Sequence, residues 1–188
     1  MTSGKPMVSS VCVYCGSQVG DATLYRDSAA RLGAALARAR VRLVYGGGSI
    51  GLMGVCADAA LASGGAVTGV IPRFLATKEV AHAGLADLVL VDSMHERKRV
   101  MFDRSDAFVA LPGGYGTLDE LFEMVTWRQL GRHEKPILLV NLGGFYDHLV
   151  AHVDRAIEAG FVAPRLRALL AVARDVDEAL KQLGIPSA

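Results

Sequence analysis

Short apolar runs alternate along this chain with longer segments whose apolar residues recur at helical spacing. The apolar runs predict strands over residues 8–15, 41–45, 66–71, 87–91, 107–111 and 136–141. Helices are predicted over residues 23–40, 50–62, 94–104, 118–130 and 145–159, with one or two more over 165–183. Residues 73–85 are expected to be irregular or briefly helical.

The order of these elements predicts the fold class. Several of the strands are apolar without polar alternation, which is typical of parallel strands that are covered on both faces. We therefore expect an α/β fold, a Rossmann-like three-layer sandwich with a mostly parallel sheet. The chain shows no linker, low-complexity tract or internal repeat, so residues 1–188 are expected to form a single nucleotide-binding catalytic domain.

Composition narrows the possible partners and location. Apolar residues make up 52% and charged residues 21% of the 188 residues, which is enough for a packed core. A net charge of +1 gives no reason to expect nucleic acid or a membrane as a partner, and no apolar run approaches the ~20 residues that a bilayer requires. The N-terminal residues lack an apolar leader, and three cysteines are typical of a reducing compartment, so we expect a cytoplasmic protein.

Four segments with unusual residues come directly after predicted strands. They are Gly16 with Ser17 and residues 46–49, 93–98 and 112–120. In a parallel α/β sheet, ligands bind beyond the carboxyl ends of the strands, where the strand order reverses. We expect these segments to meet in one site.

The segment YGGGSIGLMG contains Gly46, Gly48 and Gly51 in G-x-G-x-x-G spacing between a strand and a helix. Backbone N–H groups of such a turn can contact a phosphate, so Gly47 and Gly48 are candidate substrate-binding residues. The next strand ends without the acidic residue that holds a dinucleotide ribose, and no lysine follows the glycines as in a P-loop. A tight turn with no ligand is the other interpretation.

The segment LPGGYGTLDELFE places three glycines between a strand and a helix, which favours an anion-binding nest of backbone N–H groups. Thr117 and Glu120 have the spacing of a capping box. Glu120 could instead point into the cleft as a catalytic carboxylate. The spacing alone favours the capping box.

The segment SMHERKRVMFD has a second possible capping box, formed by Ser93 and Glu96. Arg97 and Lys98 lie in the first turns of the predicted helix, where the helix dipole disfavours cations. Two cations there indicate a bound anion, which Arg97 can hold with its bidentate fork. The alternative is a solvated charged face, to which Arg99 is assigned.

Other signals are weak. Cys12 and Cys15 have C-x-x-C spacing, but on one strand they point to opposite faces. His148 and His152 lack the glutamate of a zinc protease motif, and no G-x-S-x-G is present. No metal and no cofactor are predicted. Phe122 and Trp127, on the helix after Glu120, are expected in the core or at a subunit contact.

PGGYGT followed by Glu120, together with the M-x-x-R-K spacing of Met94, Arg97 and Lys98, resembles the LONELY GUY family of cytokinin-activating phosphoribohydrolases. Members were often labelled lysine decarboxylase-like. The resemblance extends over residues 11–161. It implies a Rossmann-like homodimer with active sites at the subunit interface.

The resemblance also implies an activity, the hydrolysis of the N-glycosidic bond of N6-modified adenosine 5′-monophosphates. The sequence leaves open whether AMP is also a substrate. Arg97 and Glu120 would be the catalytic pair. The resemblance and the motifs imply further substrate-binding residues: Ser17, Glu79, Met94, Lys98, Gly113, Gly114, Tyr115, Gly116, Thr117, Leu118 and Asp119. The partner implied is a nucleoside monophosphate, and no cofactor is implied.

The residue types suit this chemistry. Cleavage of an N-glycosidic bond builds positive charge on the sugar, which Glu120 could stabilise while orienting the attacking water. Arg97 would hold the ribose or the phosphate. Three alternatives are a nucleotide-binding sensor on the same fold, an NAD(P) oxidoreductase and a pyridoxal phosphate-dependent lysine decarboxylase. None of the five lysines has a recognisable cofactor context for the last of these.

Overall fold

One parallel sheet organises the computed structural model, which describes residues 8–76 and 81–186. Its strands are β1 (Ser10–Tyr14), β2 (Arg42–Tyr45), β3 (Val67–Pro72), β4 (Asp87–Val91), β5 (Ala107–Ala110), β6 (Ile137–Val140) and β7 (Ala171–Ala173). They are arranged in the order β4-β3-β2-β1-β5-β6-β7, and every neighbouring pair is parallel. The predicted α/β class with a parallel sheet is confirmed.

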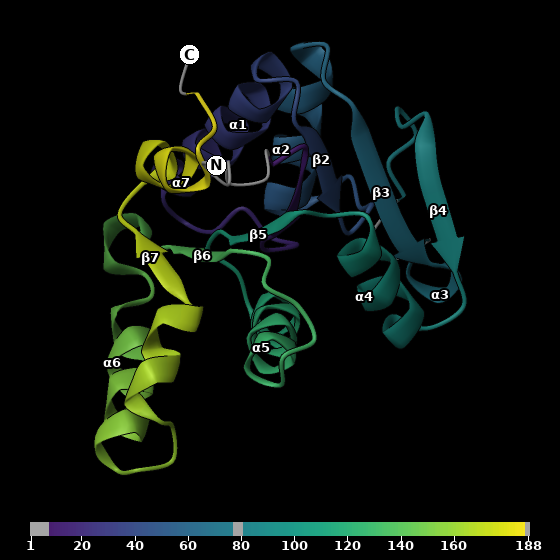
Figure 1. Ribbon diagram of the computed structural model, residues 1–188. Coiled ribbons are helices and arrows are strands. Elements are labelled where there is room, and N and C mark those ends of the chain that lie inside the picture. The colour runs from purple at the N-terminus through teal and green to yellow at the C-terminus, as the bar shows by residue number, and fades with distance from the viewer. Residues whose placement is uncertain (1–7, 77–80, 187–188) are drawn as a thin grey trace, which may run out of the picture.

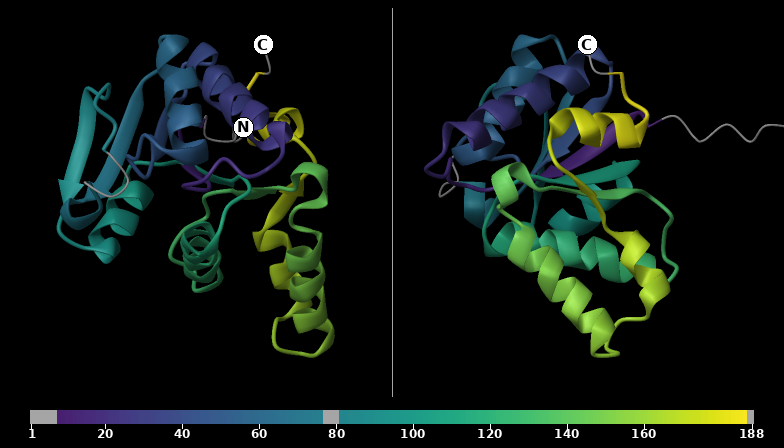
Figure 2. Two further views of the ribbon diagram at one scale, coloured as in Figure 1. Left: turned by 180° about the vertical axis from the view of Figure 1, so that it is seen from behind. Right: turned by 90° about the vertical axis from the view of Figure 1, so that its left-hand side faces the viewer.

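Helices cover both faces of this sheet (Figures 1 and 2). They are α1 (Thr23–Arg38), α2 (Gly51–Ala62), α3 (Arg73–Ala76), α4 (Met94–Asp103), α5 (Tyr115–Gln129), α6 (Asp147–Glu158) and α7 (Val176–Leu183), with 3-10 turns η1 (Leu142–Gly144) and η2 (Pro164–Leu169). Helices α1, α2 and α7 lie on one face and α4, α5 and α6 on the other. Across the described residues, no helix is both long and apolar enough to cross a membrane.

The strand sequences are apolar throughout because both faces of the sheet are covered. All residues of β1, β5 and β6 are buried. Along β1, Val11 and Val13 pack into the core beneath α1 and α2, and Cys12 and Tyr14 into the core beneath α4 and α5. Cys12 and Cys15 therefore face opposite cores, as predicted from strand geometry.

The path of the chain creates a switch point between β1 and β5. From β1 the chain moves outward to β4 at one edge, returns to β5 beside β1, and then moves outward to β7. The loops after β1 and β5 therefore diverge from adjacent strands, which is where ligands bind in such sheets. The two loops are in contact, since Gly16 N donates a hydrogen bond to Pro112 O at 3.0 Å.

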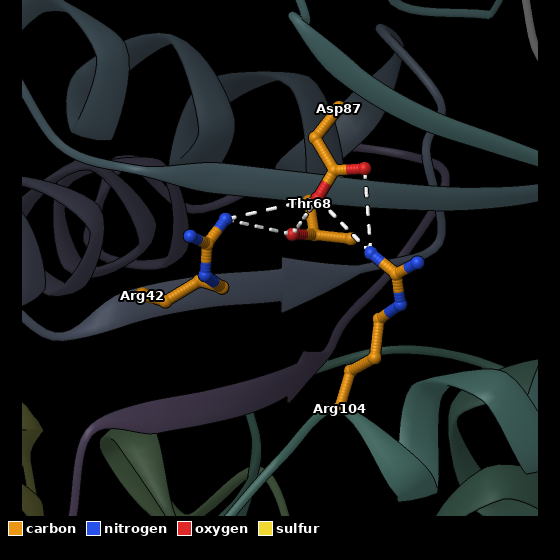
Figure 3. A network of polar contacts seen from close by, with 4 residues as sticks. All are labelled: Arg42, Thr68, Asp87 and Arg104. Atoms are coloured by element: carbon orange, nitrogen blue, oxygen red, sulfur yellow. Dashed lines mark hydrogen bonds and ion pairs between the residues drawn. The ribbon is translucent and has the colours of Figure 1, made fainter.

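A polar network joins the amino-terminal ends of β2, β3 and β4 to the end of α4 (Figure 3). The Asp87 carboxylate accepts hydrogen bonds from the Thr68 hydroxyl at 2.7 Å and from Arg104 Nη1 at 3.1 Å. Arg42 Nη1 donates to the Thr68 hydroxyl at 3.1 Å and lies 3.7 Å from Asp87 Oδ2. The network lies at the amino-terminal ends of the strands, whereas the loops after β1 and β5 lie at the carboxyl ends.

The prediction for residues 165–183 was wrong in part. That segment contains η2 and the edge strand β7 before α7 begins at Val176. Strand β7 is only three residues long and pairs with β6 through Leu138 and Ala171. A run of three residues shows no period, so pairing with β6 decides its conformation rather than local propensity.

Candidate active site

A cavity of about 280 Å³ opens at the carboxyl ends of β1 and β5. Its lining residues are Cys15, Gly16, Ser17, Met53, Arg97, Gly114, Tyr115, Gly116, Thr117 and Glu120. They come from the loop after β1, from α2, from α4 and from the start of α5. Three of the four segments expected to converge therefore form the wall. The fourth, residues 46–49, contacts the wall through Arg97.

Arg97 is fixed in the wall by its own helix, by β3 and by the turn after β2. Helix α4 begins with the predicted capping box, because Glu96 N donates to Ser93 Oγ at 3.1 Å. One turn into α4, Arg97 is only 5% exposed. Its Nε donates to Val70 O at 3.1 Å and its Nη2 to Gly46 O at 2.8 Å. These bonds set the direction of the guanidinium group.

The glycine turn after β2 supports Arg97 and the segment that comes after α3. A Cβ atom on Gly46 would collide with Arg97 Nη2. Gly47 O accepts a hydrogen bond from His82 N at 3.0 Å, and Gly48 forms an isolated bridge with Ala81. Gly47 and Gly48 thus contact a neighbouring segment and lie outside the cavity lining.

Glu120 lies in the cavity wall on the second turn of α5, and its residue is 9% exposed. The capping-box interpretation of Thr117 and Glu120 is wrong. Helix α5 begins at Tyr115 with Gly114 as its N-cap, and no side chain caps this end. Thr117 is already helical, so it cannot be the cap that the spacing suggested. The helix was predicted to begin at Leu118 because glycines have low helix propensity.

The first turn of α5 provides donors for an anion. The first N–H groups of an α-helix have no partner within the helix, and the helix dipole adds positive potential there. No acidic residue occupies this turn. Thr117 is 3% exposed and lines the cavity, whereas the Tyr115 residue is 95% exposed at its rim. This end of the cavity is suited to a phosphate.

Other predicted residues lie beside the cavity rather than in its wall. Lys98 Nζ lies 3.1 Å from Asp119 Oδ2 and 3.3 Å from Glu123 Oε2, and so joins α4 to α5. Leu118 packs against the core on the same face of the sheet. The Met94 sulfur lies 3.9 Å from Arg97 Nη1. Glu79 lies outside the described residues.

Met53 and Cys15 line the cavity but were not predicted to do so. Met53 is one of many apolar residues in α2, and nothing in its sequence context distinguishes it. Burial, followed by nearby thiols and Glu120, raises the pKa of Cys15 well above its usual value, so its thiol stays neutral. Within residues 8–76 and 81–186, no group of three or more His, Cys, Asp and Glu is placed to hold a metal ion.

Solved structures resemble this fold over nearly its whole length. The molybdenum cofactor carrier protein from Chlamydomonas reinhardtii has a TM-score of 0.67 at 22% identity, covering 93% of this chain and 96% of that one. The molybdenum cofactor binding protein from Rippkaea orientalis has a TM-score of 0.70 at 17% identity, covering 96% and 98%. At these identities, the likeness shows a shared fold.

Sequence comparison identifies the family. The family model described as "Possible lysine decarboxylase" matches residues 53–183. A cytokinin riboside 5′-monophosphate phosphoribohydrolase of Arabidopsis thaliana is 46% identical over 173 residues, covering 92% of this chain and 81% of that protein. One from Rhodococcoides fascians is 45% identical over 183 residues, covering 97% and 92%. This chain therefore belongs to the LONELY GUY family.

Proposed function

We propose that this chain hydrolyses the N-glycosidic bond of N6-modified adenosine 5′-monophosphates, releasing the free base and ribose 5-phosphate. One observation carries the proposal: Arg97 and Glu120, from two different helices, line one cavity beside the amino terminus of α5. Relatives that are 45–46% identical over most of the chain are named as enzymes of this activity.

The amino terminus of α5 would hold the 5′-phosphate. Backbone N–H groups of Gly114, Tyr115 and Gly116 and the Thr117 hydroxyl are the donors available there. Gly113 supports this loop from outside the lining. The binding energy of the phosphate is remote from the bond that breaks, and it can hold the ribose in a reactive position.

Glu120 and Arg97 would act on the sugar. As the bond between base and ribose breaks, positive charge develops on the sugar, and the Glu120 carboxylate can stabilise it and orient the attacking water. Arg97 would hold the ribose or phosphate, since its direction is already set by Val70 and Gly46. Ser17, in the cavity wall, and Met94, whose sulfur lies 3.9 Å from Arg97 Nη1, would contact the nucleotide.

We propose a homodimer on the face formed by α5, α6 and η2. None of the residues of α6 is buried, although Leu149 and Val153 lie on its apolar side. With Phe122 and Val125 of α5 they line an apolar groove of about 350 Å³. A second copy of this chain is the occupant proposed, because α5 carries both this face and Glu120. An interface here would join the subunits next to their active sites.

Two further assignments concern the chain as a whole. One continuous sheet contains all seven strands of the described residues, which supports a single domain. The three cysteines are all unpaired and buried, which is typical of a reducing compartment and supports a cytoplasmic location.

The substrate prediction is tested with three compounds. Purified protein is incubated with AMP, with N6-isopentenyladenosine monophosphate and with the corresponding riboside, and free base is measured by chromatography. We expect much faster cleavage of the monophosphates, because the riboside lacks the group that α5 would bind. Equal turnover of the monophosphate and riboside would contradict this arrangement. Nucleotide binding without product would favour the sensor alternative.

The role of Glu120 is tested by Glu120→Gln. We expect kcat to fall by at least about 100-fold, as for loss of a general base or a charge-stabilising group. AMP binding, measured by calorimetry, should stay within a few-fold of the wild type. Glu158→Gln on α6, whose side chain is 67% exposed, is the control. Retained turnover in Glu120→Gln would remove this residue from the mechanism.

A further inference from the structure

We propose that Lys98 is a positioning residue whose ion pairs with Asp119 and Glu123 hold α4 and α5 in the arrangement that places Arg97 and Glu120 in one cavity. The inference rests on the proposed function for its kinetic consequence. It gives Lys98 a role different from the direct substrate contact expected from the sequence.

The geometry of the bridge is well defined. Lys98 Nζ lies 3.1 and 3.3 Å from the two Asp119 oxygens and 3.3 Å from Glu123 Oε2. The Lys98 side chain is 9% exposed and that of Glu123 is 22% exposed. Asp119, at 57%, faces solvent more. A largely buried ammonium group thus lies between two carboxylates of the neighbouring helix.

The bridge joins positions directly beside the catalytic pair. On α4, Lys98 is the residue after Arg97, and on α5 the two acceptors flank Glu120 at one residue before and three after. Arg97 donates hydrogen bonds to Val70 in β3 and to Gly46 after β2, and these bonds fix the position of α4 relative to the sheet. The direction of Glu120 depends on where α5 lies, and Lys98 ties α5 to α4. A change in the distance between α4 and α5 would therefore move Glu120 relative to Arg97.

Burial gives the bridge its strength. Removing one partner of a buried ion pair leaves the other charge unpaired in a poorly solvated position, which costs more than losing a surface pair. Glu123 Oε2 is buried and, apart from the Lys98 ion pair, has no hydrogen-bond partner among the described residues. Burial lowers the pKa of Lys98, but the hydrogen bond to Asp119 and the charge of Glu123 outweigh this and keep it above its usual value. The ammonium group therefore persists through neutral pH.

A direct role in binding substrate predicts a different kinetic result. Lys98 does not line the cavity, whereas Arg97 and Glu120 do. A positioning residue should affect kcat, because displacement of a catalytic group by about 1 Å can reduce the rate about 100-fold. A phosphate ligand should instead affect KM and AMP affinity. The two roles are therefore separable in one set of measurements.

The experiment compares Lys98→Met with Arg99→Met. Arg99, the next residue on α4, forms an exposed ion pair with Asp103 of the same helix and is the matched control. We expect Lys98→Met to lower kcat by about 10- to 100-fold. KM and AMP affinity should stay within about threefold of the wild type. Lys98→Arg should recover most of the lost activity, and Arg99→Met should behave as wild type.

A double-mutant cycle tests the coupling itself. Glu123→Gln should lower kcat in the same direction, and the double variant should be little worse than Lys98→Met, because both changes remove one interaction. A raised KM with kcat retained, or no rescue by Lys98→Arg, would overturn the proposal. Wild-type turnover tests the proposed function separately. If the wild type is inactive, thermal unfolding of the four proteins in the cycle still tests the coupling between Lys98 and Glu123. Additive losses of stability would show that the two residues do not interact and would overturn the proposal.

Discussion

Gly113 and Gly46 lie behind the cavity wall, at two places with no room for a side chain. A Cβ on Gly113 would collide with the Thr117 hydroxyl and lie 2.9 Å from Gly16 N. A Cβ on Gly46 would collide with Arg97. These glycines are required by close approach between loops, and the approach brings the ends of β1 and β5 together. At the scale of single residues, close packing restricts which amino acids can surround this site as much as the chemistry of the site does.

Gly113→Ala tests the loop. The added methyl group must displace Thr117 or the backbone of the β1 loop, so we expect a loss of about 1–3 kcal/mol in the free energy of unfolding. The measurement is urea unfolding, with Gly116→Ala as the control. At Gly116, on the first turn of α5, an added Cβ meets nothing within 4 Å, so stability should be unchanged or rise by up to about 1 kcal/mol. Equal effects of both changes would show that the close contact at Gly113 is unimportant.

The sequence motifs identified three of the segments that line the cavity, but they could not show which of two neighbouring residues faces it. Successive residues of an α-helix point about 100° apart. Arg97 and Glu120 therefore line the cavity, while Lys98 and Asp119, one position away, meet each other between the helices. Side-chain direction depends on where the helix starts and on the surface against which it packs. For α5 the start was obscured by the glycines before Thr117.

Among the helices, α4 and α7 begin in the same way. Ser93 accepts a hydrogen bond from Glu96 N in α4, and Asp175 accepts one from Glu178 N in α7 at 2.8 Å. Of these two helices, only α4 carries a residue of the cavity. The two caps therefore make a matched pair, one next to the site and one remote from it.

Replacing each cap by alanine should separate stability from activity. Ser93→Ala and Asp175→Ala should each lower the free energy of unfolding by about 1 kcal/mol. Only Ser93→Ala should also lower kcat, because loosening the first turn of α4 displaces Arg97. Chemical unfolding and steady-state kinetics on both variants provide the check. A matching kcat loss in Asp175→Ala would show that activity merely follows stability.

His133 links the end of α5 to β6 and should make stability depend on pH. Its Nε2 lies 3.0 Å from Met124 O, and its Nδ1 accepts a hydrogen bond from Lys135 N at 3.1 Å. Burial, with the charges of Lys135 and Arg128, lowers the pKa of His133 below 6.5. The unfolded chain then takes up a proton that the folded chain resists, so this stabilisation is present above about pH 6.5 and is lost as pH falls below it.

Urea unfolding at pH 7.5 and 5.5 measures this effect. The wild type should lose stability on acidification, and His133→Gln should lose less, although it is the less stable protein at pH 7.5. His148→Gln, at an exposed position on α6, is the control and should keep the wild-type dependence. An unchanged pH dependence in His133→Gln would rule out this histidine as the source.

Helices with a clear hydrophobic period and strands with a long apolar run were predicted well. Elements whose conformation depends on contacts with distant parts of the chain were not. The buried strands and α1 are expected from hydrophobic pattern alone. Strand β7 exists because Ala171–Ala173 pairs with β6, and no local pattern in three residues encodes that pairing. Its neighbour η2 begins at a proline, which suits a helical first turn but does not set the length of the helical segment.

At the scale of the whole molecule, the position of the site is a consequence of the strand order. A site near a reversal of strand order was expected from the fold class. The structure places the reversal between β1 and β5, and the cavity lies there. The proposed role of the α5 and α6 face was only half predictable. Phe122 was expected in the core or at a subunit contact, because apolar residues on a helix look the same in sequence in either place.

Phe122→Asp tests the proposed dimer. A carboxylate in the apolar groove between α5 and α6 should prevent a second copy from binding there, because the charge would be buried without a partner. Light scattering should give about twice the 19.9 kDa chain mass for the wild type and the single-chain mass for the variant. Arg155→Ala, on the exposed side of α6, is the control. A wild-type mass of one chain would contradict the dimer.

The polar network of Arg42, Thr68, Asp87 and Arg104 lies at the starts of β2, β3 and β4 (Figure 3). None of its four residues lines the cavity, which opens at the carboxyl ends of β1 and β5. The contacts that align the strand starts are therefore separate from the loops that line the cavity. Substitutions in the loops after β1 and β5 can therefore change specificity without disturbing the contacts that align the strand starts. The same separation makes this scaffold suitable for loop exchange between relatives.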